Sequence, residues 1–151
     1  MPEAGELAPD FTLASDTEGD VTLSALRGRK VVLYFYPRDD TPGCTTQACG
    51  IRDSWAALEG TGAKLLGISP DDVAAHGRFR AKFDLPHTLL ADEGAEVAKA
   101  YGVWVEKNMY GKKSMGVERS TFLIDADGRI AQVWRRVKPA DHVDLLLEAL
   151  A

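Results

Sequence analysis

Residues 31–50 read VVLYFYPRDDTPGCTTQACG, and they set the architecture that the rest of the chain must fit. β-Branched, aromatic or aliphatic residues run without interruption from 31 to 36, and Pro37 ends the run. Such a run is typical of a strand covered on both faces, as found at the centre of a parallel or mixed sheet. The sequence therefore predicts a central strand that is followed directly by a loop rich in turn residues.

An apolar stripe with helical spacing follows this loop, formed by Ile51, Trp55 and Leu58. Gly60 and Gly62 come next, and glycine commonly ends a helix. Both cysteines of the chain therefore lie between a central strand and the body of a helix.

The remaining pattern alternates strands with helices. Further strands are expected at 11–13, 21–23, 64–69, 88–91, 121–125 and 130–134. Helices are expected from Asp71 and Asp72 through Phe83, at 93–101 and at 143–150, whereas 106–116 is polar and predicts a loop. The first two strands predict a small N-terminal β-hairpin, and Ala-Asp-Gly at 126–128 predicts a second hairpin near the end.

This order predicts an α/β fold of three layers, with a central mixed β-sheet flanked by helices. The chain has 151 residues, which fits one domain over 1–151. Eighteen Lys and Arg against twenty-three Asp and Glu give a net charge of −5, and this balance argues against a nucleic-acid partner.

No secretory signal is visible in residues 1–10, and no apolar run approaches the ~18–20 residues of a membrane span. We therefore expect no membrane association and a cytoplasmic location. Thiols stay reduced there, and a cysteine pair is more often catalytic, redox-sensing or metal-binding than a static bridge.

Cys44 follows Pro42 and Gly43, so it should lie in the first turn of the helix. Free N–H groups and the positive end of the helix dipole favour a thiolate there, and the thiolate is the nucleophilic form of cysteine. Sites of α/β proteins also lie beyond the carboxyl ends of strands, which is where Cys44 falls. The plain alternative is that Cys44 and Cys49 are small buried apolar side chains.

Metal binding is not expected. Four residues separate the cysteines, but a structural zinc site needs four ligands, and no second close Cys or His pair exists. The histidines at 76, 87 and 142 are isolated in sequence, and we expect surface or partly buried side chains rather than ligands.

A static disulfide is also disfavoured, because in an intact helix the Cα atoms of Cys44 and Cys49 would lie roughly 8.6 Å apart, beyond the ~7 Å that a disulfide spans. Five residues of unwound chain reach easily, so the spacing predicts a redox pair whose oxidation melts the first helical turns. Gly50 makes these turns easier to lose. The spacing differs from a thioredoxin-type C-x-x-C, and a peroxide fits as the oxidant.

Pro37, Thr41 and Cys44 form the pattern P-x-x-x-T-x-x-C, and the stretch YFYPRDDTPGCTTQACG resembles peroxiredoxins of the bacterioferritin-comigratory-protein or peroxiredoxin Q branch. The resemblance extends from GELAPDFTL through GVERSTFLIDADGRI to the last helix. It implies a thioredoxin-like fold and reduction of hydroperoxides without a cofactor. Cys44 would be the peroxidatic residue, oxidised to a sulfenic acid, and Cys49 the resolving residue. A thioredoxin-like protein would then reduce the disulfide.

The same resemblance gives roles to three other residues. Thr41 would position the peroxide, Arg119 would lie beside the thiolate, and Pro37 would shield the thiolate from water. Fixed donors are suited to the negative charge that develops on a leaving oxygen, and Arg119 supplies a permanent charge. Without the motif, Thr41 could simply cap a helix and Arg119 could form a surface ion pair.

Other polar residues near the motif receive plainer interpretations. Asp39 and Asp40 are expected to be solvated loop charges, and Trp104 is expected to pack in the core. The sequence leaves the role of Tyr110 open.

Two other functions remain possible from sequence. One is a redox sensor that passes its disulfide state to a protein partner, and the other is a disulfide exchanger that works without peroxide. The enzyme is favoured, with a monomer expected over a homodimer. The sequence does not identify the preferred peroxide or the reductant.

Overall fold

The computed structural model describes residues 2–151, apart from the side chain of Met109. One mixed sheet dominates these residues. Its strands are β1 (Thr12–Ser15), β2 (Asp20–Thr22), β3 (Val31–Phe35), β4 (Lys64–Ser69), β5 (Thr88–Ala91), β8 (Ser120–Ile124) and β9 (Ile130–Trp134). They lie in the order β2-β1-β5-β4-β3-β8-β9. The sequence-based prediction of a mixed sheet is confirmed.

Strand β3 lies inside this sheet, as its uninterrupted apolar run predicts. It pairs with β4 in parallel and with β8 antiparallel. All five of its residues are buried. Because both edges and both faces of the strand are covered, the loop that leaves its carboxyl end starts from a rigid support.

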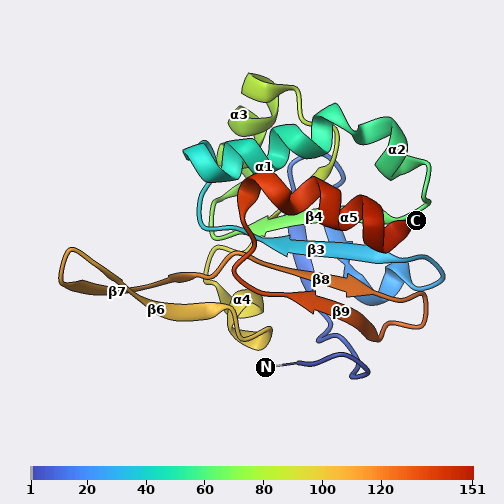
Figure 1. The fold of residues 1–151 in the computed structure, drawn as a ribbon. Helices are drawn as coiled ribbons and strands as arrows, with labels where there is room; N and C mark the ends of the chain where they lie inside the picture. The colour runs from blue at the N-terminus through green and yellow to red at the C-terminus, as the bar shows by residue number, and fades with distance from the viewer. Residues whose placement is uncertain (1) are drawn as a thin grey trace.

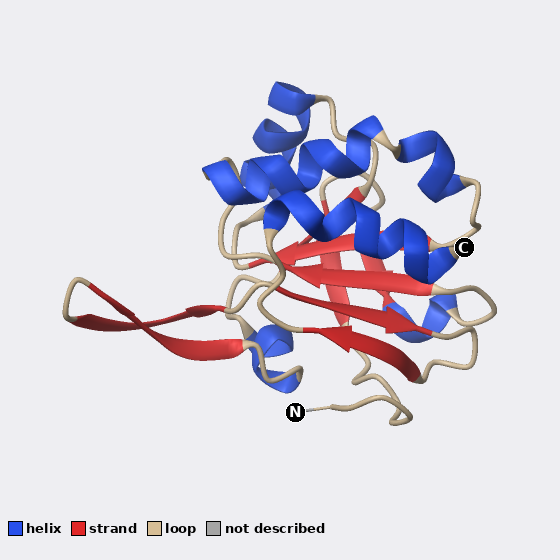
Figure 2. Cartoon of the chain, viewed as in Figure 1, coloured by secondary structure: helices blue, strands red, loops and turns tan. Residues whose placement is uncertain are grey.

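Helices cover both faces of the sheet (Figures 1 and 2). One face carries α1 (Pro42–Asp53), α2 (Trp55–Glu59), α3 (Val73–Phe83) and α5 (His142–Leu150). The other carries the short α4 (Glu96–Ala100) and the 3-10 turn η1 (Leu23–Leu26). A second 3-10 turn, η2 (Pro139–Asp141), leads into α5. The arrangement has three layers, with the sheet in the middle.

Alternating side chains of β3 build the two cores. Val32 and Tyr34 point to the side of α1, where they join Ile51. Leu33 and Phe35 point to the side of α4, where rings such as Tyr101 pack against them. This alternation follows from the pleat, which sends successive side chains to opposite faces.

Most predicted elements are confirmed, with changes at their ends. The N-terminal and C-terminal hairpins form as β1–β2 and β8–β9. The apolar stripe after β3 does not belong to one helix, because the chain breaks at Ser54 between α1 and α2. Helix α4 is shorter than predicted and begins at Glu96, since the Asp92 carboxylate accepts hydrogen bonds from the N–H groups of Val97 and Ala98.

The prediction of a loop at 106–116 is wrong. These residues belong to a two-stranded arm, β6 (Trp104–Met109) and β7 (Lys112–Val117), which projects away from the main sheet (Figure 1). Tyr110 and Gly111 form its tip with positive φ angles of 54° and 78°, as a tight hairpin turn requires. Much of the arm is exposed to water, so its strands contain few apolar residues. The polar sequence therefore does not show the pattern of a strand.

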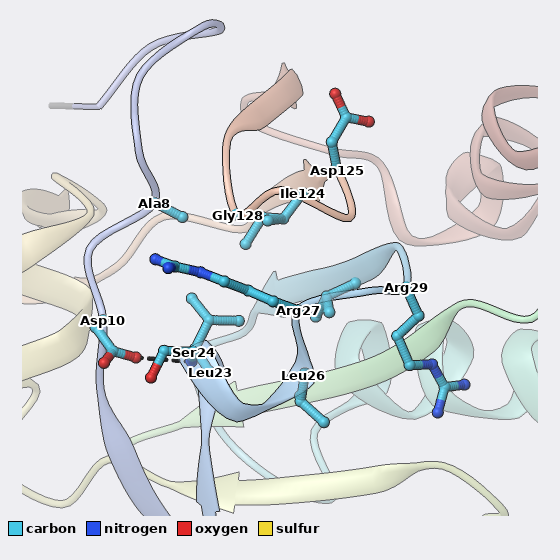
Figure 3. A pocket seen from close by; sticks show the side chains of 11 residues that line it. Ala8, Asp10, Leu23, Ser24, Leu26, Arg27, Arg29, Ile124, Asp125 and Gly128 are labelled. Carbon is cyan, nitrogen blue, oxygen red and sulfur yellow. Dashed lines mark hydrogen bonds between the residues drawn. The ribbon is translucent and has the colours of Figure 1, made fainter.

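A small cavity lies between η1, the N-terminal segment and the β8–β9 turn (Figure 3). It borders Val31 at the start of β3, the end of the sheet opposite the loop at 37–41. Its volume of about 10 Å³ is no more than a single water needs. The Arg27 side chain crosses it so close to Gly128 that a Cβ there would lie 2.7 Å from Nε. The cavity therefore leaves no room for a substrate.

Candidate active site

Cys44 lies in the first turn of α1, as predicted. Helix α1 begins at Pro42, and Thr41 is its N-cap residue with an extended backbone. The Cys44 residue is 1% exposed. The N–H groups of a first turn have no partner inside the helix and form its positive end. The Cys44 thiol therefore lies at the positive end of α1 and is shielded from bulk water.

Arg119 brings a positive charge to this sulfur from 75 residues further along the chain. Its Nη1 atom donates to the Cys44 Sγ atom at 3.4 Å. Arg119 lies between β7 and β8, and its carbonyl oxygen accepts from the N–H of Val137 at 3.0 Å. Gly43 allows the close approach, because a Cβ at this position would lie 3.0 Å from Arg119 Nη2.

Gln47 is a site residue that the sequence reasoning missed. It is buried in α1, and its Oε1 atom accepts a hydrogen bond of 2.7 Å from Nη1 of Arg119. Within the described residues, its Nε2 atom is buried and has no hydrogen-bond partner. The signal was available, because Gln47 lies three residues after Cys44 and the i, i+3 positions of a helix share a face. Gln47 fixes the guanidinium that contacts the sulfur.

Thr41 and Pro37 lie in the loop between β3 and α1. The Thr41 hydroxyl donates to the carbonyl of Arg38 at 2.8 Å and makes no capping hydrogen bond with the helix. The reading of Thr41 as a simple side-chain cap is therefore wrong. Pro37 is half-buried directly after β3. Both residues lie in the loop that precedes Cys44, at the same end of the sheet as the sulfur.

Cys49 lies further along the same helix and is half-buried. Both thiols are free. Because α1 is intact from Pro42 to Asp53, a bond between the two sulfurs requires part of the helix to unwind.

Two buried histidines contact the ring of Tyr34, on the face of the sheet that α1 covers. The Nε2 atom of His142 is 2.9 Å from the Thr121 hydroxyl, and that of His87 is 2.5 Å from the Tyr34 hydroxyl. Burial, together with the charge of Arg119, lowers the pKa of His142 to about 3. Burial, followed by the charges of Arg80 and His142, lowers the pKa of His87 to about 3.

The expectation of surface or partly buried histidines is wrong. His76 is 0% exposed, and His87 and His142 are each 1% exposed. At least one ring nitrogen of each finds a polar partner from a segment distant in the chain.

Asp39 and Asp40 behave differently from each other. Asp40 is exposed and pairs with Lys82 at 2.8 Å, which agrees with a solvated loop charge. Asp39 is buried, and its carboxylate contacts the Tyr36 hydroxyl at 2.6 Å and His76 Nδ1 at 2.6 Å. The expectation for Asp39 is therefore wrong, because two partners replace the water that the carboxylate loses.

The arm contributes one charged residue near the site. Burial and the charge of Arg119 lower the pKa of Lys107, and the charge of Cys44 acts in the opposite direction. Trp104, at the base of the arm, is partly buried against the core, as expected. Tyr110 at the tip is 99% exposed.

The fold and these contacts define a class: a thioredoxin-like protein with a buried thiol at a helix start and an arginine beside it. The sequence model of the AhpC/TSA family matches residues 4–133. The chain belongs to this family and is a peroxiredoxin of the bacterioferritin-comigratory-protein or Q branch, a thiol peroxidase.

Relatives and solved structures agree with this assignment. A putative peroxiredoxin bcp of Coxiella burnetii is 53% identical over 93% of each chain. Peroxiredoxin Bcp of Bacillus subtilis is 48% identical over 98% of this chain and 94% of the relative. The bacterioferritin comigratory protein of Xanthomonas campestris is 41% identical, with a TM-score of 0.90 over 98% of this chain and 97% of the other.

Proposed function

We propose that Cys44 is the peroxidatic residue, which attacks one oxygen of a hydroperoxide. The S–O bond forms as the O–O bond breaks, and the second oxygen leaves as hydroxide or alkoxide and takes up a proton. The sulfur loses two electrons and becomes a sulfenic acid, while the peroxide is reduced to water or an alcohol. The substrate class is supported by the X. campestris relative, whose structures were studied for alkyl peroxide reduction.

Cys49 then resolves the sulfenic acid. Its thiolate attacks the Cys44 sulfur, an S–S bond forms, the S–O bond breaks, and the oxygen leaves as hydroxide, which takes up a proton to become water. Since the two residues lie in one intact helix, this step includes local unwinding of α1. A thioredoxin-like dithiol protein exchanges with the disulfide and restores both thiols.

The observation that carries this proposal is the 3.4 Å contact between Arg119 Nη1 and the Cys44 sulfur at the start of α1. A fixed guanidinium stabilises both the thiolate and the charge that develops on the leaving oxygen. Thr41 is assigned to position the peroxide through its hydroxyl, and Pro37 to limit the access of water.

The setting of this reaction forms part of the proposal. Both cysteines lie in one helix, so the disulfide needs no second copy, and we propose a monomer acting as a single domain over 1–151. We also propose a cytoplasmic location, where reducing conditions keep the thiols ready for reaction. No helix among residues 2–151 is long and apolar enough to cross a membrane.

The test is stopped-flow oxidation of the reduced protein by hydrogen peroxide and by an organic hydroperoxide. Cys44→Ser is expected to abolish peroxide turnover with thioredoxin, because it removes the nucleophile. Full turnover by this variant would exclude Cys44 as the peroxidatic residue.

Cys49→Ser separates resolution from attack. We expect one equivalent of peroxide to react and a Cys44 sulfenic acid to accumulate, detected by mass spectrometry after dimedone trapping. Unchanged turnover with thioredoxin would show that Cys49 is not the required resolving residue. If the wild-type protein reacts once but does not cycle with any reductant, the sensor function replaces the enzyme.

A further inference from the structure

A second group of polar side chains lies directly behind the loop that carries Thr41. It consists of Asp39, Asp71 and His76, whose polar atoms lie within 4.8 Å of one another. His76 has no exposed side-chain surface, and the Asp39 side chain is 6% exposed. Such a group is costly to bury unless each member has a partner.

The two ring nitrogens of His76 both face oxygen acceptors. Nδ1 lies 2.6 Å from Oδ2 of Asp39, and Nε2 lies 2.8 Å from the carbonyl oxygen of Leu90. When the Asp39 carboxyl is ionised, both ring nitrogens donate, so these contacts favour the imidazolium form of His76. Neither nitrogen then has a lone pair for a metal ion. The group is a buried ion pair instead of a metal site.

Asp39 is held from three structural elements at once. The hydroxyl of Tyr36, just after β3, donates to its Oδ1 at 2.6 Å, and His76 approaches from α3. The backbone N–H of Asp39 donates to Oδ2 of Asp71 at 2.8 Å. Asp71 is fixed in turn by the hydroxyl of Ser69, which donates to the same Oδ2 atom at 2.6 Å. Both the side chain and the backbone of Asp39 are therefore anchored.

Asp39 stands at the centre of the loop that leads to the reactive sulfur. The preceding residue, Arg38, offers the carbonyl that accepts the Thr41 hydroxyl at 2.8 Å. The following residue, Asp40, turns the chain with a φ of 58°. Thr41 is the N-cap of α1, and Cys44 follows in its first turn. The direction of the Thr41 hydroxyl thus depends on where Asp39 is held.

We infer that Asp39 and His76 are positioning residues of the peroxidase reaction, which hold the 37–41 loop in place so that Thr41 meets the peroxide at Cys44. The inference rests on the proposed function. Neither residue touches the sulfur; they act through the loop backbone.

The charges around His76 support this role. Burial lowers the pKa of His76, but the hydrogen bond and charge of Asp39, the Leu90 carbonyl and the charge of Asp71 outweigh it and raise the pKa above its usual value. The adjoining pocket also holds the cations of Arg38, Arg78 and Lys82, and the carboxylate of Asp40, which pairs with Lys82. The imidazolium therefore persists to higher pH than a free histidine.

The test measures two rates of Cys44 in a Cys49→Ser background: oxidation by hydrogen peroxide and alkylation by iodoacetamide. Asp39→Asn keeps the shape but removes the charge that pairs with His76. We expect peroxide oxidation to fall about 10- to 100-fold, as misplaced reacting groups commonly cause, while alkylation stays equal or rises. Alkylation does not need Thr41, so it reports thiol ionisation and access alone.

Asp40→Asn is the matched control, since it makes the same charge change one residue away on an exposed side chain. It should alter neither rate. His76→Asn changes the other member of the pair, on α3, and replaces the charged ring with a neutral donor. It tests the same Asp39–His76 interaction if Asp39→Asn fails to fold. The double variant Asp39→Asn, His76→Asn should lose little more than either single variant, because both remove one interaction.

Three results would overturn the inference. One is a folded Asp39→Asn or His76→Asn protein whose peroxide rate is unchanged. Another is an equal fall in both rates, which would indicate an effect on the thiolate instead of on positioning. The third is a wild-type Cys44 that does not react with peroxide. This result would reject the proposed function itself, and measuring the parent protein distinguishes it from the first two results.

Discussion

Several groups together supply the electrostatic environment of the Cys44 sulfur. The helix start supplies N–H dipoles from the backbone, and Arg119 supplies a full charge from a distant segment. Gln47 joins the two, because it belongs to the helix and accepts a hydrogen bond from the arginine. The sulfur, the arginine and the amide therefore form one unit that depends on α1 being folded.

Gln47→Ala should reduce the rate of Cys44 oxidation by about 10-fold or more, because a hydrogen bond to a charged group contributes about 1.5–3 kcal/mol. Without the amide, Arg119 is free to leave the sulfur. Stopped-flow oxidation in a Cys49→Ser background measures the effect.

Thr46→Ala is the control for Gln47→Ala, because Thr46 is the exposed neighbour in the same helix. Its rate should match the parent protein. If Gln47→Ala were as fast as Thr46→Ala, the hydrogen bond would have no role in holding Arg119.

Helix α1 has two tasks that oppose each other. In the proposed reaction, it must be folded to activate Cys44, and it must open to let Cys49 reach the oxidised sulfur. Gly50 lies in its interior, where glycine costs about 1 kcal/mol relative to alanine. A Cβ at Gly50 would lie 3.8 Å from the Cβ of Val143, an ordinary contact, so the glycine is not required for packing.

Gly50→Ala should stabilise α1 by about 1 kcal/mol and slow disulfide formation roughly fivefold. The sulfenic acid should then live longer and become overoxidised to sulfinic acid more readily at high peroxide concentration. Mass spectrometry of quenched samples measures both products.

The matched variant is Gly77→Ala in α3, where a Cβ would meet nothing within 4 Å. It should raise global stability by a similar amount without slowing the disulfide. Equal rates in both alanine variants would contradict a local opening of α1.

The buried histidines make the stability of the whole molecule depend on pH. His87 and His142 have a pKa of about 3 in the folded protein, well below the ordinary 6.5. As the pH falls below 6.5, the unfolded chain binds protons at these positions and the folded chain does not. Their contribution therefore lowers stability as the pH falls, down to the folded pKa.

We expect each of these two histidines to lower the free energy of unfolding by about 2 kcal/mol between pH 7.5 and pH 5. His76 has the opposite sign, because its raised pKa stabilises the fold below 6.5 and the gain is lost as the pH rises through the folded value. Urea denaturation across this range measures the sum.

His142→Asn isolates one histidine, since other titrating groups are common to both proteins. The variant should lose about 2 kcal/mol less than the wild-type protein over the same pH range. Parallel stability curves for the two proteins would show that His142 binds its proton equally in the folded and unfolded states, against the lowered pKa.

The sequence-based predictions were most accurate where neighbouring residues along the chain determine the local structure. Residues 31–36 predicted β3 because every side chain in the run is apolar, and Pro42-Gly43 predicted the helix start at Cys44. The arm of β6 and β7 was missed, because its strands are held by backbone pairing and carry few buried side chains. Asp39 was misjudged, because its partner His76 lies 37 residues away.

The sequence by itself determined the central strand, the position of Cys44 at a helix start and the five-residue offset that separates Cys44 from Cys49. These features follow from neighbours along the chain. Only the tertiary structure decided which distant groups surround them: Arg119 at the sulfur, and His76 at Asp39 behind the loop. The reason is physical, because Coulomb attraction and hydrogen bonding act over a few ångströms in space, and packing brings together residues that the sequence leaves far apart.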